Sequence, residues 1–267
     1  MLYAAYFDAS TARTDFPVLT VAGAVAPIKK WTRFKQQWRT ALANEDVSEF
    51  HATDCHASKG DYRTWKGDPA RRGAFLRGLQ KIIKDNCNKL FIASVELAPW
   101  AEVNQEYCLE EFFHSPYALA GRAVVEGVLE WAKRKGTVLP QIIFEHGDTG
   151  WEGLVELCAR LNVVPIRLPK RLATPCQVGD FLAWKTRITA TNALRGLDKL
   201  ERKAGHCREN AVGIIREVGS LNMQLVRPVK NGIFSSDTLR RNCVKFKIPK
   251  RKHLTDPGEQ GPQGLVR

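Results

Sequence analysis

The sequence lacks the features of membrane and secreted proteins. No apolar run in its 267 residues approaches the roughly 18 uninterrupted residues that a membrane-spanning helix needs. The first residues do not have the basic-then-apolar order of a signal peptide. The seven cysteines are scattered, and no two of them form a Cys-x-x-Cys pair, which argues against a disulfide scaffold. We therefore expect a cytoplasmic protein without a membrane partner.

The sequence also lacks internal repeats, and its positive charge is concentrated in one part. The net charge is +13. Residues 1–180 contain 23 Lys and Arg and 21 Asp and Glu, whereas residues 181–267 contain 18 and 7, so the last third carries +11. Nucleic acid is the commonest polyanionic partner of such a region, and it would bind in a salt-sensitive way. A solvated basic tail is the alternative.

The order of the apolar patterns predicts an α/β protein with a mixed sheet. Two strands open the chain, at 2–7 and 16–25, and the apolar spacing from 31 to 42 predicts a helix. The later elements alternate strand and helix, which implies parallel strands joined by crossover helices. They lie at 141–144, 151–161, 163–168 and from 175 onward.

The hydrophobic content of 44% and the length suit one large domain with an appendage. We expect a domain over residues 1–205 and a basic, partly helical C-terminal extension over residues 206–267. Short helices are predicted at 211–218 and 236–244, and the Gly- and Pro-rich end is expected to be disordered. The polar residues 52–67 are predicted to form a loop.

Three acidic residues stand where apolar elements end or begin. Asp8 follows the first strand, and Glu145 follows the strand at 141–144. Asp180 lies in the otherwise apolar start of a helix, where a carboxylate is costly to desolvate unless it is paired or binds a metal. In a mixed sheet of this order the two strands can be neighbours, so the three side chains can meet. Such a trio is suited to one or two Mg²⁺ or Mn²⁺ ions, which activate water for phosphodiester hydrolysis.

Four short motifs follow one another over about residues 1–190. They are Tyr6-Phe7-Asp8-Ala9-Ser10, Glu49-Phe50-His51-Ala52-Thr53-Asp54, Ile142-Ile143-Phe144-Glu145 and Gln177-Val178-Gly179-Asp180-Phe181-Leu182-Ala183. In this order they resemble the motifs of the family known as domain of unknown function 3800. The resemblance implies an RNase H-like fold, with a mixed sheet and helices on both faces, in a superfamily of metal-dependent nucleases. It also implies that Asp8, Glu145 and Asp180 bind the metal. His51 would lie at the edge of the site, where it positions a phosphate or transfers a proton.

The sequence departs from the family pattern at three positions. Ala9 stands where the family has Glu, Glu145 where it more often has Asp, and Gly179 where it usually has Ala. The changes at 145 and 179 are mild. The missing carboxylate at position 9 could weaken or abolish a second metal site, for which Glu49 or Asp148 could compensate.

Two further groups have competing interpretations. Segment 51–56 contains His, Asp and Cys and could bind zinc, but no second cluster with ligand spacing accompanies it. Asp148 could be a ligand in place of Glu145, although capping of the helix near Trp151 is the simpler interpretation.

A basic run near the end of the chain could hold a phosphate backbone. Its candidate nucleic-acid-binding residues are Lys245, Lys247, Lys250, Arg251 and Lys252. The interleaved Phe246 could stack on a base.

The sequence thus predicts a magnesium- or manganese-dependent nuclease acting on RNA or DNA, and the resemblance suggests a mobile-element or phage-defence context. One alternative is a nucleic-acid-binding protein of the same fold with a degenerate site. Another is a protein-interaction or toxin module of defence systems.

Overall fold

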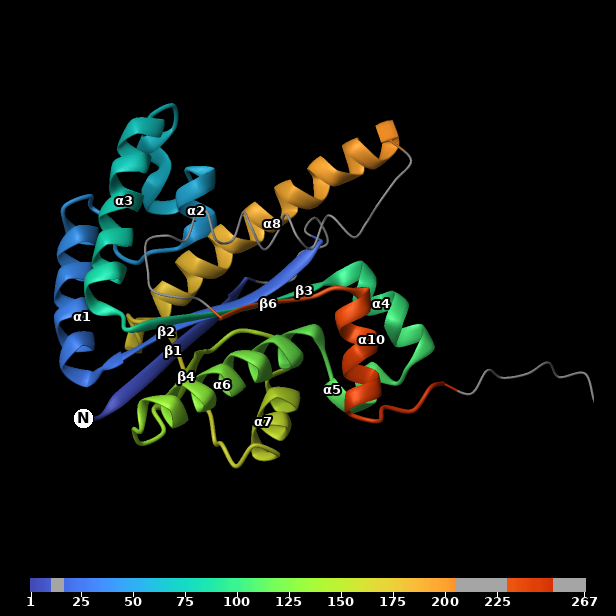
Figure 1. Cartoon of the computed structure of the whole chain (residues 1–267). Coiled ribbons are helices and arrows are strands. Elements are labelled where there is room, and N and C mark those ends of the chain that lie inside the picture. Colours follow the sequence, from blue (N-terminus) through green and yellow to red (C-terminus); the bar gives the residue numbers. More distant parts are fainter. Residues whose placement is uncertain (11–16, 205–229, 252–267) are drawn as a thin grey trace, which may run out of the picture.

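The computed structural model describes residues 1–10, 17–204 and 230–251 (Figure 1). Its centre is a six-stranded sheet with the order β5-β4-β1-β2-β3-β6. The antiparallel neighbours are β1 (Tyr3–Ser10), β2 (Val18–Pro27) and β3 (Lys89–Glu96). The parallel additions are β4 (Gln141–Glu145) next to β1, β5 (Ile166–Leu168) next to β4, and β6 (Lys230–Phe234) next to β3. The predicted α/β class is confirmed, and the mixed order agrees with the RNase H-like sheet that the resemblance implies.

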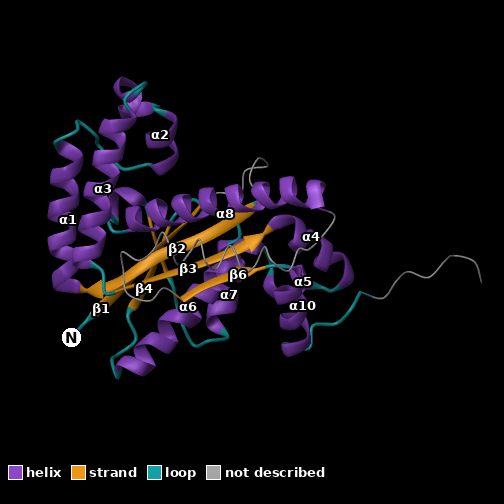
Figure 2. Cartoon of the chain, turned by 45° about the horizontal axis from the view of Figure 1, so that its top comes forward, coloured by secondary structure: helices purple, strands orange, loops and turns teal. Residues whose placement is uncertain are grey.

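Helices cover both faces of this sheet, as Figure 2 shows. The first face carries α1 (Ile28–Ala43), α2 (Ala52–Ala57), α3 (Pro69–Asn86) and α8 (Cys176–Ala204). The second face carries α4 (Leu97–Glu106), α5 (Leu109–Phe113), α6 (Pro116–Lys135), α7 (Trp151–Ala159) and α10 (Ser236–Lys245). The sheet therefore separates two apolar cores. No helix among the described residues is long and apolar enough to span a membrane.

Alternation along β1 divides its side chains between the two cores. Ala5 and Phe7 pack in the core on the α6 side, whereas Ala4 packs in the core on the α8 side. Asp8 follows the same alternation as Ala4, and its β-carbon lies against α8. Ala9 packs against the opposite core. A carboxylate at position 9 would therefore start from the other face of the strand.

The helix ends follow the capping signals of the sequence. Asp68 accepts a hydrogen bond from the backbone N–H of Arg71 at 2.8 Å and is followed by Pro69. Ser115 caps α6 in the same way, and Gly136 ends that helix with a φ of +63°. These caps fix where α3 begins and where α6 begins and ends.

The structure contains elements that the sequence did not predict. Residues 52–67 form α2 and the 3₁₀ helix η1 (Gly60–Trp65) instead of a loop. α2 buries Ala52 and Cys55, and the buried rings of Tyr62 and Trp65 in η1 both contact Phe75. The sequence also did not predict β6, which extends the sheet within the region assigned to the C-terminal extension. The predicted helix at 211–218 and the segment 256–267 lie outside the described residues.

Candidate active site

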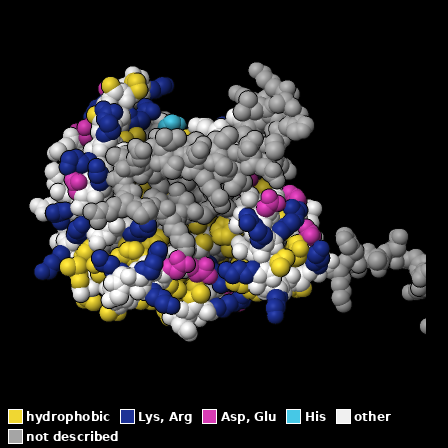
Figure 3. Space-filling view, in the orientation of Figure 1, with side chains coloured by type: hydrophobic (Ala, Val, Ile, Leu, Met, Phe, Trp, Pro, Cys, Tyr) yellow, Lys and Arg dark blue, Asp and Glu magenta, His cyan; other side chains and the backbone are white. Residues whose placement is uncertain are grey.

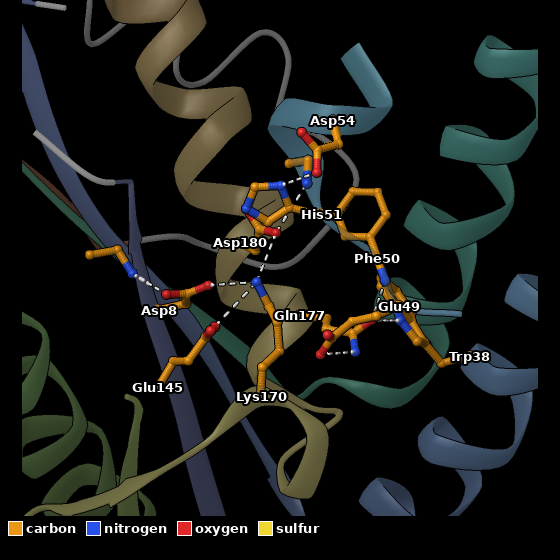
Figure 4. Close-up of polar contacts among 12 residues, drawn as sticks. Asp8, Trp38, Glu49, Phe50, His51, Asp54, Glu145, Lys170, Gln177 and Asp180 are labelled. Carbon is orange, nitrogen blue, oxygen red and sulfur yellow. Dashed lines mark hydrogen bonds and ion pairs between the residues drawn. The ribbon is translucent and has the colours of Figure 1, made fainter. Parts of the chain in front are cut away.

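The structure brings the three predicted acids together around one atom. Asp8 and Glu145 lie side by side, because parallel β1 and β4 pair up to Phe7 and Phe144. Asp180 reaches the same place from α8. The Nζ atom of Lys170 lies 3.2 Å from Oδ2 of Asp180, 3.3 Å from Oε2 of Glu145 and 3.7 Å from Oδ2 of Asp8 (Figure 4). Four elements thus converge on one cationic centre.

Lys170 belongs to the short 3₁₀ helix η2 (Lys170–Leu172), just after β5. Only 14% of its side chain is exposed. Burial by itself would lower the pKa of Lys170, but Asp180, Asp8 and Glu145 outweigh it and raise that pKa, so the ammonium stays charged. Two opposite unit charges 4 Å apart attract by about 4 kcal/mol at an effective dielectric constant of about 20, and desolvation offsets part of this.

Lys170 is not among the site residues that the sequence predicts. A single lysine between a strand and a helix looks like a solvated surface residue. The available signal was topological: Lys170 follows the end of β5, and β5 is parallel to β4, so it lies at the sheet edge where Glu145 also lies.

Burial raises the pKa of Asp8 well above its ordinary value. Lys170 opposes this shift, whereas the nearby carboxyls of Asp180 and Glu145 add to it. The ammonium of Lys170 therefore offsets part of the cost of holding the three acids close together.

Gln177 and Asp180 lie three residues apart on α8 and tie this helix to the segment before α2. The Oε1 atom of Gln177 accepts hydrogen bonds from Nε1 of Trp38 at 2.7 Å and from the backbone N–H of Phe50 at 3.0 Å. Oδ2 of Asp180 accepts from the backbone N–H of Ala52 at 3.0 Å. The backbone is thus held on both sides of the predicted His51.

His51 lines the same cavity as the acids, at its more open edge. Its Nδ1 atom lies 3.1 Å from Oδ2 of Asp54, and 52% of its side chain is exposed. This placement agrees with what the resemblance implies, and the role of His51 remains a prediction.

The cavity has a volume of about 400 Å³, within the usual range of small-molecule sites. Its lining includes six residues with formally charged side chains, namely Asp8, Glu145, Asp148, Lys170, Asp180 and Arg187. Trp184 contributes an aromatic wall.

The donor chemistry of this cavity fits a divalent metal ion. Carboxylate oxygens are the ligands that Mg²⁺ and Mn²⁺ prefer. The Oε2 atom of Glu145 is buried without a hydrogen bond, and a cation, Lys170, already lies between the three acids. Within the described ranges, no three His, Cys, Asp or Glu side chains stand in metal-ligand geometry, since the acids surround the ammonium instead.

The segment 51–56 has poor chemistry for the zinc alternative. Burial raises the pKa of the Cys55 thiol to about 12, which disfavours the thiolate that binds zinc. The ring of His56 packs near the ring of Trp184, with centroids 5.1 Å apart.

Asp148 lies in the cavity, and its predicted role as a helix cap is wrong. Gly150 is the N-cap of α7, and the turn before it carries Gly147 at a φ of +144°. Burial raises the pKa of Asp148 to about 7, with Glu145 adding to the shift and Arg167 opposing it.

Glu49, the other candidate to compensate for Ala9, points toward Gln177 (Figure 4). Its Oε1 atom lies 3.5 Å from Nε2 of Gln177, which donates to it. Of the two acids, Asp148 is the one that lines the cavity.

Several residues of the predicted nucleic-acid-binding run contact their own protein. Lys250 lies 3.5 Å from Glu106, and Arg251 donates to the backbone carbonyl of Asn104 at 2.8 Å. Lys245 and Lys247 are exposed. Figure 3 shows Lys and Arg side chains over much of one face, with Asp and Glu among them near α10. Lys252 lies outside the described residues.

Phe246 does not fit the predicted stacking role. Its ring centroid lies 5.8 Å from those of both Phe112 and Phe113, and the guanidinium of Arg122 lies 5.0 Å from it. The ring therefore anchors the end of α10 on the second core.

No family model matches the sequence, and no curated protein matches it significantly. Solved structures with some similarity include RNase HII from Archaeoglobus fulgidus in its complex with PCNA, at 15% identity and a TM-score of 0.40, covering 84% of this chain and 92% of that one. Ribonuclease H2 from Pyrococcus horikoshii OT3 is 13% identical with a TM-score of 0.39, and the match covers 78% of this chain and 83% of that one. Bst-RNase HIII in complex with Mn²⁺ is 11% identical with a TM-score of 0.39, and the match covers 76% of this chain and 56% of that one. Values this low assign no function to the site.

Proposed function

We propose that the protein is a divalent-metal-dependent nuclease that hydrolyses phosphodiester bonds of RNA or DNA. One observation carries this proposal: Asp8, Glu145 and Asp180 all lie within 3.7 Å of one cationic atom inside a cavity. The three acids come from separate elements and are mostly buried, which is costly unless a cation compensates them.

Asp8, Glu145 and Asp180 would hold a Mg²⁺ or Mn²⁺ ion. When bound, such an ion lowers the pKa of a coordinated water and stabilises charge on phosphate oxygens. The protein supplies the rest. Gln177 and Asp180 fix the backbone around His51, and the imidazole at the cavity edge would orient a phosphate or carry a proton.

The basic last third of the chain would supply the nonspecific attraction to a polyanion. Exposed Lys245 and Lys247 are its best-placed members among the described residues. This part of the proposal is independent of cleavage, because electrostatic binding does not need the carboxylates.

A second candidate is a nucleic-acid-binding protein with an inactive site. The ion pairs of Lys170 favour it, since they compensate the three acids without any metal. The two candidates differ in whether a divalent ion changes the fate of the bound nucleic acid.

The test is cleavage of labelled RNA, DNA and hybrid duplexes, single- and double-stranded, in Mg²⁺, Mn²⁺ or EDTA. Wild type and Asp180→Asn are compared, with binding measured in parallel. Metal-dependent cleavage by wild type alone is expected, and it also identifies the substrate. Binding without cleavage in either metal contradicts the nuclease proposal and supports the second candidate.

A further inference from the structure

We infer that Lys170 is a permanent cationic member of the site, so that the site takes one divalent ion, with the ammonium in place of a second. This inference rests on the proposed function and specifies how its metal site is built.

The position of Lys170 is built into the fold. Its backbone lies in η2, directly after Pro169, and the N–H groups of Leu172 and Ala173 donate to the carbonyl of Pro169 at 2.9 and 3.2 Å. The side chain is mostly buried and contacts acids from β1, β4 and α8. A surface lysine that reached a single acid by chance would share neither feature.

The charge balance of the cavity favours a single divalent ion. With all three acids ionised, as metal binding requires, Asp8, Glu145 and Asp180 together with Lys170 leave a formal charge of −2. The remaining Asp and Arg of the lining, Asp148 and Arg187, leave that balance unchanged. One divalent ion neutralises it, whereas a second would leave an excess of positive charge in a mostly buried place.

The position of Ala9 also favours a single divalent ion. A two-ion site needs further carboxylates. Ala9 lines the cavity but packs on the opposite core and offers none, and Asp148, the remaining acid of the lining, is matched in formal charge by Arg187. Lysine binds phosphate as a point charge. The Nζ atom of Lys170 would therefore contact a phosphate oxygen of the substrate and stabilise the negative charge that develops during hydrolysis.

The test is the stoichiometry and affinity of Mn²⁺ binding, measured by the electron paramagnetic resonance of free Mn²⁺, on the full-length protein. Wild type is compared with Lys170→Met, with Lys170→Arg, which keeps the charge, and with Arg171→Met. Arg171 is the matched control, because it is the next residue of η2 and is exposed.

Wild type and Arg171→Met should each bind one Mn²⁺ per chain. Lys170→Met should bind the ion about tenfold more tightly, since a repelling charge is gone, and should lose cleavage. Lys170→Arg should keep the wild-type affinity. Two ions on wild type, no ion at all, or Lys170→Met with wild-type affinity and cleavage would each overturn the inference.

The two proposals fail in different ways. One bound Mn²⁺ on wild type without cleavage of any substrate contradicts the nuclease function and supports the single-ion site. Metal-dependent cleavage with two bound ions supports the nuclease and contradicts the role of Lys170. Wild-type stoichiometry decides the second point even if Lys170→Met fails to fold.

Discussion

Gly179 of α8 lies directly against Asp8 of β1. A β-carbon built on Gly179 would stand 2.4 Å from the backbone nitrogen of Asp8 and 2.7 Å from the carbonyl oxygen of Ala22. Both obstacles are backbone atoms in paired strands, so neither can move aside easily. The glycine that looked like a mild departure from the family pattern is therefore what lets α8 bring Asp180 next to Asp8.

Gly179→Ala should push α8 away from the sheet. We expect a loss of about 1–3 kcal/mol in the free energy of unfolding, as for other overpacked sites, together with weaker Mn²⁺ binding. Denaturant unfolding and a Mn²⁺ titration measure both. Gly196→Ala is the matched control on the same helix, because a β-carbon there meets no atom within 4 Å. Equal behaviour of the two variants would contradict the close-contact explanation.

Gln177→Leu should destabilise the protein, because two buried hydrogen-bond donors lose their acceptor. The variant leaves Nε1 of Trp38 and the backbone N–H of Phe50 buried without their acceptor. We expect a loss of about 2–6 kcal/mol in the free energy of unfolding, since each of the two unsatisfied buried groups costs about 1–3 kcal/mol. Combining it with Trp38→Phe removes one donor, so the double variant should lose less than the sum of the two single changes. Losses in the free energy of unfolding that simply add up would show that the hydrogen bond between Trp38 and Gln177 contributes little to stability.

Asp148 should make stability depend on pH when metal is removed by EDTA. Its pKa is about 7 in the folded protein, whereas an unfolded chain has an aspartate pKa of about 3.9. Between these values the folded protein binds more protons, so the free energy of unfolding falls as pH rises through this range. Asp148→Asn should remove this dependence. The free energy of unfolding of the variant, minus that of wild type, should therefore be higher at pH 7.5 than at pH 4.5 by on the order of 1 kcal/mol or more.

Urea unfolding of both proteins across pH 4.5–7.5 measures this difference. Asp85→Asn is a control of opposite sign, because the hydrogen bond from Lys81 lowers the pKa of Asp85. The free energy of unfolding of Asp85→Asn should not increase relative to that of wild type as the pH rises. A constant difference between Asp148→Asn and wild type over the whole range contradicts the assignment of a buried, proton-binding Asp148.

Lys245→Ala and Lys247→Ala should each weaken nucleic-acid binding about equally for all sequences. Each should also lower the slope of log affinity against log salt by about one, because one phosphate contact is lost. Lys29→Ala, at an exposed position on α1, serves as the control. Binding titrations at several salt concentrations give the slopes, and unchanged slopes in both variants would place the nucleic acid elsewhere.

The sequence indicated the three acids for reasons that the structure retains. Asp8 lies inside β1 and not after it as predicted, but it directly follows the part of β1 that pairs with β4, and Glu145 is the last residue of β4. Asp180 is 9% exposed among apolar residues, as its surroundings required. These signals are local, so they survive without knowledge of the tertiary structure.

Other features depend on contacts that no local pattern records. Lys170 becomes part of the site only because η2 lies next to β1, β4 and α8. η1 forms in a polar segment where two aromatic rings pack against Phe75. Phe246 looked free beside basic residues, yet it packs on Phe112 and Phe113. Tertiary packing decided each of these cases.

The most direct measurement is the single-turnover cleavage rate of the best substrate by Asp8→Asn, Glu145→Gln and Asp180→Asn, each compared with wild type in Mg²⁺ and in EDTA. Glu152→Gln, an exposed acid at the start of α7, is the control. We expect wild type and the control to cleave only with Mg²⁺, and each of the three variants to be at least about 100-fold slower. Cleavage that persists in EDTA, or a wild-type rate in any of the three variants, would contradict a metal-dependent site built from these acids.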